Sequence, residues 1–112
     1  MSFEEMLKKL QEEYIENLPN KISQLEQLIK KMDKKELENL FHKLKGTGKT
    51  YGIPEASLLG KVMEKICQDD KDVNKHANIS LDLLKKISEK RSQGDSFEIE
   101  FNQDYQQLIK AS

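Results

Sequence analysis

Residues 37–64, LENLFHKLKGTGKTYGIPEASLLGKVME, decide the fold. In the first half of this stretch, apolar or small residues recur at the period of one helical face. They are Leu37, Leu40, Phe41, Leu44, Gly48 and Tyr51. Three glycines then lower helix propensity, and Ile53-Pro54 favours a turn with proline at the first position of a new helix. We therefore predict one amphipathic helix over about 35–51 and a second that begins at residue 54 or 55.

The residues before this stretch show a long helical pattern with one interruption. Apolar residues recur mostly at steps of three and four from Phe3 to Met32. Pro19 removes a backbone donor and disfavours helical geometry at Leu18, so we expect a kink or a break there. Because the stripe keeps its phase, we predict a short leading helix that runs into a longer one ending near Met32 and Asp33.

Two further helical faces follow. The inward stripe of the third bundle helix consists of Leu59, Val62, Met63, Ile66 and Cys67. The polar residues 68–72 predict a loop, and Asp72 is a plausible cap for a fourth helix reaching about Arg91. Its inward residues are Val73, Ala77, Leu81, Leu84 and Ile87. Amphipathic segments with short connections predict an all-α protein, an antiparallel up-and-down four-helix bundle with an extra N-terminal helical segment.

The C-terminal residues depart from this pattern. Residues 97–101, FEIEF, alternate apolar and acidic side chains, so we expect an extended segment lying on the bundle. Pairing of this segment with a second chain is the alternative. Asn102 is expected to cap a last short helix that carries Tyr105, Leu108 and Ile109. The expected organisation is one domain over residues 1–112, with the bundle at about 14–91 and a C-terminal appendage at 92–112.

Composition excludes several classes of partner. The 112 residues are 36% hydrophobic and 35% charged, and 19 basic against 20 acidic residues leave a net charge of −1. No general basic field is present to attract nucleic acid or an anionic membrane. Cys67 is the single cysteine, which we expect to be an apolar filler rather than a reactive thiol. With no apolar run approaching the ~20 residues of a membrane span, we expect a soluble cytoplasmic protein.

GTGKT, residues 46–50, is similar to the end of a nucleotide-binding phosphate loop. That loop needs a glycine five positions before Gly48, where this sequence has Lys43, and it needs a preceding buried strand. The residues before Gly46 instead have the period of a helix. We therefore discount a nucleotide-binding enzyme; ATP binding that depends on Lys49 and Thr50 would revive it.

His42 is the candidate reactive residue. With the apolar face inward, His42 falls ~100° to 180° away from it and is predicted to be exposed, with Lys45 and Lys49 along the same outer face. A neutral imidazole is a nucleophile near pH 7, and a lysine one turn away offers positive charge to a phosphoryl group. Gly46 leaves bare backbone beside the ring, although glycine costs a helix up to ~1 kcal/mol relative to alanine. His76 has no such lysine–glycine pair after it, so we expect a structural or solvated residue.

HKLKG followed by TYGIPEASLLGKVME resembles the signature of histidine phosphotransfer (HPt) domains. The matching residues are His42, Lys45, Gly46, Gly52 and Leu59, and the resemblance extends over about residues 14–90. It implies a four-helix bundle in which His42 is the phosphoacceptor, Lys45 the charge partner and Gly46 the clearance for docking. Lys49 is our own addition, as an auxiliary charge, from the helical geometry.

In that family, phosphoryl groups pass reversibly between receiver aspartates and the histidine nitrogen farther from the backbone. The resemblance implies a carrier and not an enzyme, without a cofactor or metal of its own, because the receiver brings the acidic pocket and Mg²⁺. The expected partners are receiver domains of response regulators or of a hybrid sensor kinase, and we expect a monomer. The alternative is a docking module that binds receivers without chemistry. The long N-terminal segment and residues after 91 differ from the minimal module, and either could dock a partner or mediate self-association.

Overall fold

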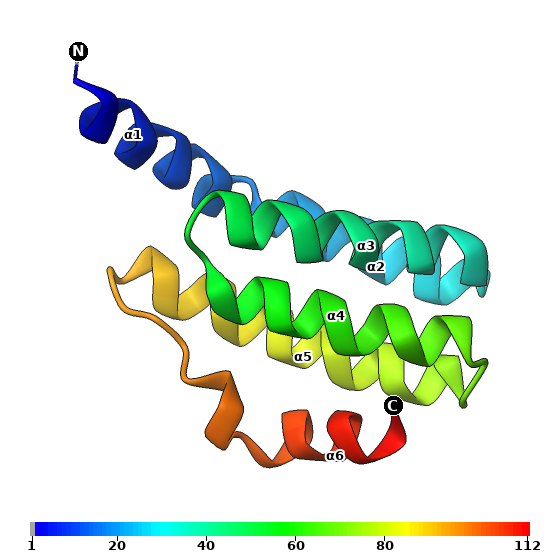
Figure 1. Ribbon diagram of the computed structural model, residues 1–112. Helices are drawn as coiled ribbons and strands as arrows, with labels where there is room; N and C mark the ends of the chain where they lie inside the picture. Colours follow the sequence, from blue (N-terminus) through cyan, green and yellow to red (C-terminus); the bar gives the residue numbers. More distant parts are fainter. Residues whose placement is uncertain (1) are drawn as a thin grey trace.

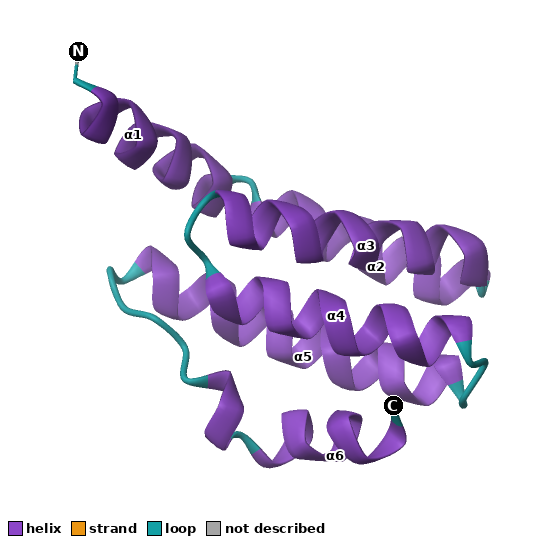
Figure 2. Ribbon diagram, in the orientation of Figure 1, coloured by secondary structure: helices purple, strands orange, loops and turns teal. Residues whose placement is uncertain are grey.

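The computed structural model describes residues 2–112, which form α-helices and one short 3₁₀ turn (Figures 1 and 2). No strand occurs within this range, so the all-α prediction is confirmed. The elements are α1 (Phe3–Glu16), α2 (Leu18–Lys31), α3 (Lys34–Thr50), α4 (Pro54–Gln68), α5 (Val73–Ser92), η1 (Ile99–Phe101) and α6 (Gln103–Ala111).

Helices α2 to α5 form the predicted antiparallel up-and-down bundle (Figure 1). Short turns join them, and the described chain contains no helix long and apolar enough to cross a membrane. The largest fully buried side chains come from all four bundle helices, and Phe41 of α3 is the bulkiest among them. Burial of these apolar faces is the dominant stabilising contribution to such a bundle.

Two glycines let α3 and α4 lie unusually close together. A Cβ added at Gly60 of α4 would lie 2.5 Å from the Lys45 backbone nitrogen and 2.6 Å from the Phe41 carbonyl oxygen. A Cβ added at Gly48 of α3 would lie 2.6 Å from the Ser57 nitrogen. Side chains on the outer edge of this helix pair can therefore bridge from one helix to the other.

The N-terminal prediction is correct about the break but wrong about lengths. Helix α1 ends before Asn17 and Pro19 lies in the first turn of α2, where its missing N–H would have no intrahelical partner anyway. Both helices have 14 residues, so the leading helix is not the shorter one. The first part of α1 also projects beyond the bundle (Figure 1), which leaves its apolar side chains exposed.

Asp72 does not cap α5 with its side chain as predicted. It occupies the N-cap position in the left-handed conformation, with φ 46° and ψ 59°, and its side chain accepts no capping bond. The buried His76 lies beneath this turn, and its Nδ1–H is shared between the carbonyl oxygens of Lys71 and Asp72 at 2.8 and 2.9 Å. His76 is therefore structural, one of the two roles expected for it.

The C-terminal residues also differ in part from the prediction. The extended segment predicted over 97–101 is wrong at 99–101, which form a 3₁₀ turn in which Ile99 is buried and Phe101 is 84% exposed. The Asn102 cap is confirmed, since its side chain accepts from the Asp104 and Tyr105 amides at 2.8 and 3.2 Å. Helix α6 then packs against α4 and α5, with Leu108 buried.

Candidate functional site

His42 lies midway along α3, on the side away from the core. Its side chain is 65% exposed, which confirms the predicted exposure. Its Nδ1 lies 2.5 Å from Oε2 of Glu64 on α4. Within residues 2–112, no group forms a hydrogen bond with the other ring nitrogen, Nε2. The ring is thus held at one nitrogen and presented to solvent at the other.

Glu64 joins His42 to Lys45. Its second carboxylate oxygen, Oε1, accepts a hydrogen bond from Lys45 Nζ, also at 2.5 Å. The Glu64 side chain is only 12% exposed, whereas the Lys45 side chain is 39% exposed. One carboxylate on α4 therefore contacts two side chains of α3, next to the close approach of the two helices at Gly60.

The charge state of Glu64 fixes the tautomer of the ring. Burial alone would raise the pKa of the Glu64 carboxyl, but the hydrogen bonds from Lys45 and His42 and the Lys45 charge bring that pKa below its ordinary value. Glu64 is then a carboxylate near neutral pH. Because a carboxylate only accepts hydrogen bonds, Nδ1 of His42 carries the proton, and in the neutral ring Nε2 keeps its lone pair.

The other two predicted site residues, Gly46 and Lys49, are not part of the His42–Glu64–Lys45 contacts. Gly46 is exposed, and an added Cβ would meet no atom within 4 Å, so the space beside His42 is open. Lys49 is exposed near the end of α3, and it forms no ion pair or hydrogen bond with Glu64 or His42 among the described residues. His42 and Lys45 are therefore brought together by Glu64, and Lys49 is not part of that cluster.

Sequence reasoning missed Glu64. A signal was present, because Glu64 interrupts an apolar helical stripe between Met63 and Ile66, and Gly60 lies one turn before it. A carboxylate at such a position needs partners from a neighbouring helix, since buried charges are usually paired. His42 and Lys45 are those partners, but their approach depends on the α3–α4 register, which periodicity alone does not give.

GTGKT is not a phosphate loop. Residues 46–50 continue α3, and the Thr50 hydroxyl donates to the carbonyl of Gly46 at 3.0 Å within that helix. Backbone amides engaged in a helix cannot wrap around phosphates. Within residues 2–112 no group of three or more histidine, cysteine or acidic side chains is arranged to hold a metal ion. Cys67 is buried, and burial raises the pKa of its thiol to about 11, as suits an apolar filler.

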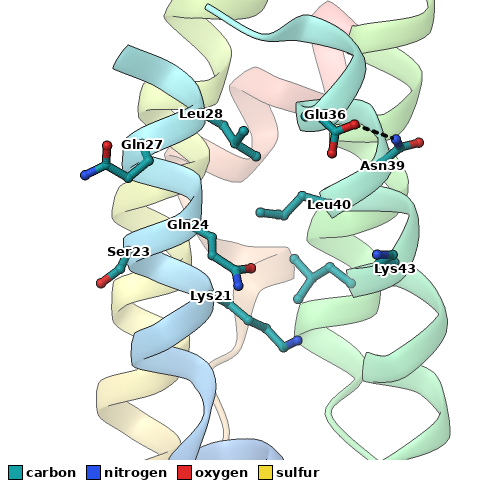
Figure 3. A pocket seen from close by; sticks show the side chains of 10 residues that line it. Lys21, Ser23, Gln24, Gln27, Leu28, Glu36, Asn39, Leu40 and Lys43 are labelled. Carbon is teal, nitrogen blue, oxygen red and sulfur yellow. Dashed lines mark hydrogen bonds between the residues drawn. The ribbon is translucent and has the colours of Figure 1, made fainter. Parts of the chain in front are cut away.

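A groove of about 500 Å³ runs between α2 and α3, beside the outer face of α3 (Figure 3). Lys21 reaches into it from α2, and Asn39 and Lys43 border it from α3. Burial, with the nearby Lys43 charge, lowers the pKa of Lys21. His42 does not line this groove, so it is a neighbour of the histidine site and not part of it.

One family model matches most of the chain. The family model described as Hpt domain matches residues 9–110 of the chain. No curated protein and no solved structure was found to match it.

Proposed function

The chain belongs to the Hpt domain family, whose members take part in histidine phosphotransfer in phosphorelays, and we propose that it carries the phosphoryl group on Nε2 of His42. The hydrogen bonding of the His42 ring is the observation that supports Nε2. His42 is exposed, and its Nδ1 is occupied by Glu64 while Nε2 faces solvent. A nucleophile with a free lone pair and a fixed ring needs little further help from its own chain.

The proposed step is a direct exchange between an aspartyl phosphate and the ring. The Nε2 lone pair attacks phosphorus, the N–P bond forms, and the P–O bond to the receiver aspartate breaks, leaving a carboxylate. No proton has to move, because Nδ1 keeps its hydrogen. The ring becomes positively charged as the bond forms, and the Glu64 carboxylate 2.5 Å from Nδ1 offsets that charge. The reverse step returns the phosphoryl group to a receiver.

Lys45 and Gly46 have separate roles in this proposal. Lys45, held by Glu64 and 39% exposed, lies one turn from His42, where its ammonium can stabilise the phosphoryl group. Gly46, four residues after His42, leaves open space beside the ring, since an added Cβ there would meet no atom within 4 Å. Lys49 contributes at most a more distant positive charge.

Partners supply the remaining chemistry. Phosphoryl transfer depends on positioning and charge neutralisation, so a receiver domain that brings its acidic pocket and Mg²⁺ completes the site. We assign this chain the role of a carrier and not of an enzyme. Its partners are receiver domains of response regulators or of a hybrid kinase, and its place is the cytoplasm, where ATP feeds such relays.

Transfer of label from a phosphorylated receiver tests the proposal. The chain is mixed with the ³²P-labelled receiver domains of its own organism, and acid-labile label on the chain is measured. We expect label on the wild type and none on His42→Gln, whereas His76→Gln serves as the histidine control. Equal labelling of His42→Gln, or no labelling by any receiver, would contradict the proposal. Receiver binding without any transfer would instead support the docking module.

A further inference from the structure

The first part of α1 carries an apolar stripe that the bundle does not cover. Its four members are Phe3 (73% exposed), Met6 (48%), Leu7 (43%) and Leu10 (36%). At ~100° per residue they lie on one face of the helix. Contiguous exposed apolar surface of this kind is uncommon on a monomer and marks contact sites.

The bundle holds α1 only near its C-terminal end. The Gln11 amide donates to the carbonyl of Tyr51 at 3.0 Å, and the hydroxyls of Tyr14 and Thr47 share a hydrogen bond at 3.0 Å. The first turns of α1 extend past the end of the bundle (Figure 1), and Leu7 and Lys8 border a pocket shared with Thr50, Tyr51 and Gly52. A partner can therefore reach the exposed stripe without disturbing the four-helix core.

Charges beside the stripe are ordered along the helix. The first turn carries Glu4 and Glu5, and the next turn carries Lys8 and Lys9. Glu4 and Lys9 border the apolar face on opposite sides, each about 110° from its centre, and Glu5 and Lys8 lie about 150° from it, toward the back of the helix. None of the four forms an ion pair with another residue of the described chain. The exposed part of α1 thus has an acidic turn followed by a basic turn, and its apolar stripe runs along both.

The order of charges along α1 is complementary to the same order read in the opposite direction. If two copies of α1 lie antiparallel with the twofold axis between residues 6 and 7, Phe3 faces Leu10 of the other copy and Met6 faces Leu7. The acidic turn of each helix then lies beside the basic turn of the other, and the helix dipoles are also opposed. We propose that the exposed face of α1 binds the same face of a second copy of this chain.

A parallel arrangement would not have these properties. It would set the acidic turns side by side and the basic turns side by side, which is destabilising. Because the bundle lies beyond the C-terminal part of α1 in each chain (Figure 1), a parallel pair would also bring both bundles to the same end, whereas an antiparallel pair would place them at opposite ends. Four apolar side chains per copy make a small contact of the transient class, which buries less than about 1,200 Å². His42 is not part of this surface, so the pairing is independent of phosphotransfer.

Charge reversal tests the pairing directly. Glu4→Lys/Glu5→Lys makes the segment all-basic, and Lys8→Glu/Lys9→Glu makes it all-acidic. Sedimentation equilibrium over roughly micromolar to millimolar protein should show wild-type dimers, monomers for each variant alone, and dimers again for their equimolar mixture. Helix content by circular dichroism checks that each variant folds.

The mixture is decisive because it cannot restore salt bridges within one helix. Rescue on mixing therefore reports contact between chains and not the stability of α1 itself. A monomeric wild type at the highest concentration, or reversal variants that dimerise as well as the wild type, would overturn the proposal.

Orientation has its own test. Under mild oxidation, Phe3→Cys mixed with Leu10→Cys should crosslink into a heterodimer, while Leu10→Cys alone should give little product. Efficient Leu10→Cys homodimers with no heterodimer would show a parallel pair and contradict the antiparallel geometry.

Discussion

At the scale of single residues, Glu64 explains why His42 is more than an exposed histidine. Its carboxylate holds the ring at Nδ1, sets the tautomer and holds Lys45 at the site. An unsupported surface imidazole would exchange between tautomers and orientations. The proposed reactive group is therefore a His42–Glu64–Lys45 cluster rather than one side chain.

Replacing Glu64 by glutamine should slow transfer while leaving the fold intact. The amide retains the shape but not the charge, so the ring loses the partner that offsets its positive charge in the phosphorylated state. A hydrogen bond to a charged group contributes about 1.5–3 kcal/mol, which corresponds to about 10- to 100-fold in rate. The rate of label transfer from a phosphorylated receiver measures this.

Histidine ¹⁵N shifts at neutral pH provide the accompanying readout for Glu64→Gln and Glu64→Ala. The wild type should show His42 protonated at Nδ1, and Glu64→Ala should show a mixture of tautomers. Unchanged rates and an unchanged tautomer in both variants would mean that Glu64 has no part in the chemistry.

At the scale of elements, the spacing of α3 and α4 positions the site. Gly60 allows the α4 backbone to approach Lys45 and Phe41, and Gly46 leaves space on the outer side of α3. Gly60 therefore matters for packing inside the helix pair, whereas Gly46 leaves the outer surface open toward a proposed partner.

Gly60→Ala should destabilise the protein by about 1–3 kcal/mol, because the added methyl group meets backbone atoms at 2.5 and 2.6 Å. Gly46→Ala is the matched control. Its methyl group meets nothing within 4 Å, and helix propensity should raise stability by up to about 1 kcal/mol. Urea denaturation measures both, and equal effects of the two substitutions would contradict the close approach of α3 and α4.

A buried ion pair ties α4 to α5 and to the appendage. Glu55 is 3% exposed, and it accepts from Arg91 Nε and Nη2 at 2.9 and 2.8 Å and from the Phe97 amide at 3.0 Å. Burial by itself raises the pKa of Glu55, but these hydrogen bonds and the Arg91 charge bring it below its ordinary value of 4.5. Glu55 thus has a lower pKa in the folded chain than in the unfolded chain.

Acid should therefore weaken this connection. A carboxyl with a depressed folded pKa stabilises the fold above its unfolded pKa, and the contribution is lost as the pH falls through the folded value. We expect the free energy of unfolding to fall as the pH is lowered from about 5, and to fall less steeply in Glu55→Gln. Urea titrations at a series of pH values measure the slope, and identical slopes would show that Glu55 is not a source of the pH dependence.

At the scale of the whole molecule, the appendage is packed on the bundle at some distance from His42. Ile99, Tyr105 and Leu108 are buried, and α6 contacts α4 and α5. This arrangement favours one cooperative unit that includes the whole C-terminal appendage, residues 92–112.

Leu108→Ala should lower the free energy of unfolding by about 2–5 kcal/mol, because Leu108 is fully buried. Ile109→Ala is the neighbouring control, since Ile109 is 43% exposed, and it should cost less than about 1 kcal/mol. One transition in each urea curve is expected. A separate early transition, or a neutral Leu108→Ala, would mean that the appendage is not part of the cooperative fold.

The sequence predicts the bundle well because apolar periodicity records which face of each helix is buried. It predicts less well where a tertiary contact decides the outcome. Phe3 and Met6 have the same period as buried residues, yet they are 73% and 48% exposed. Asp72 is a residue type that often caps helices, but here its backbone is left-handed and its side chain accepts no capping bond. Glu64 becomes part of the site only through the close packing of α3 and α4.

The position of the phosphoryl group on the ring tests the central claim most directly. The chain is phosphorylated by its receiver or by phosphoramidate, and ¹H–¹⁵N long-range correlation assigns the modified nitrogen. The account predicts phosphate on Nε2 of His42, with Nδ1 still protonated beside Glu64. Phosphate on Nδ1 of His42, or on His76 in place of His42, would contradict it.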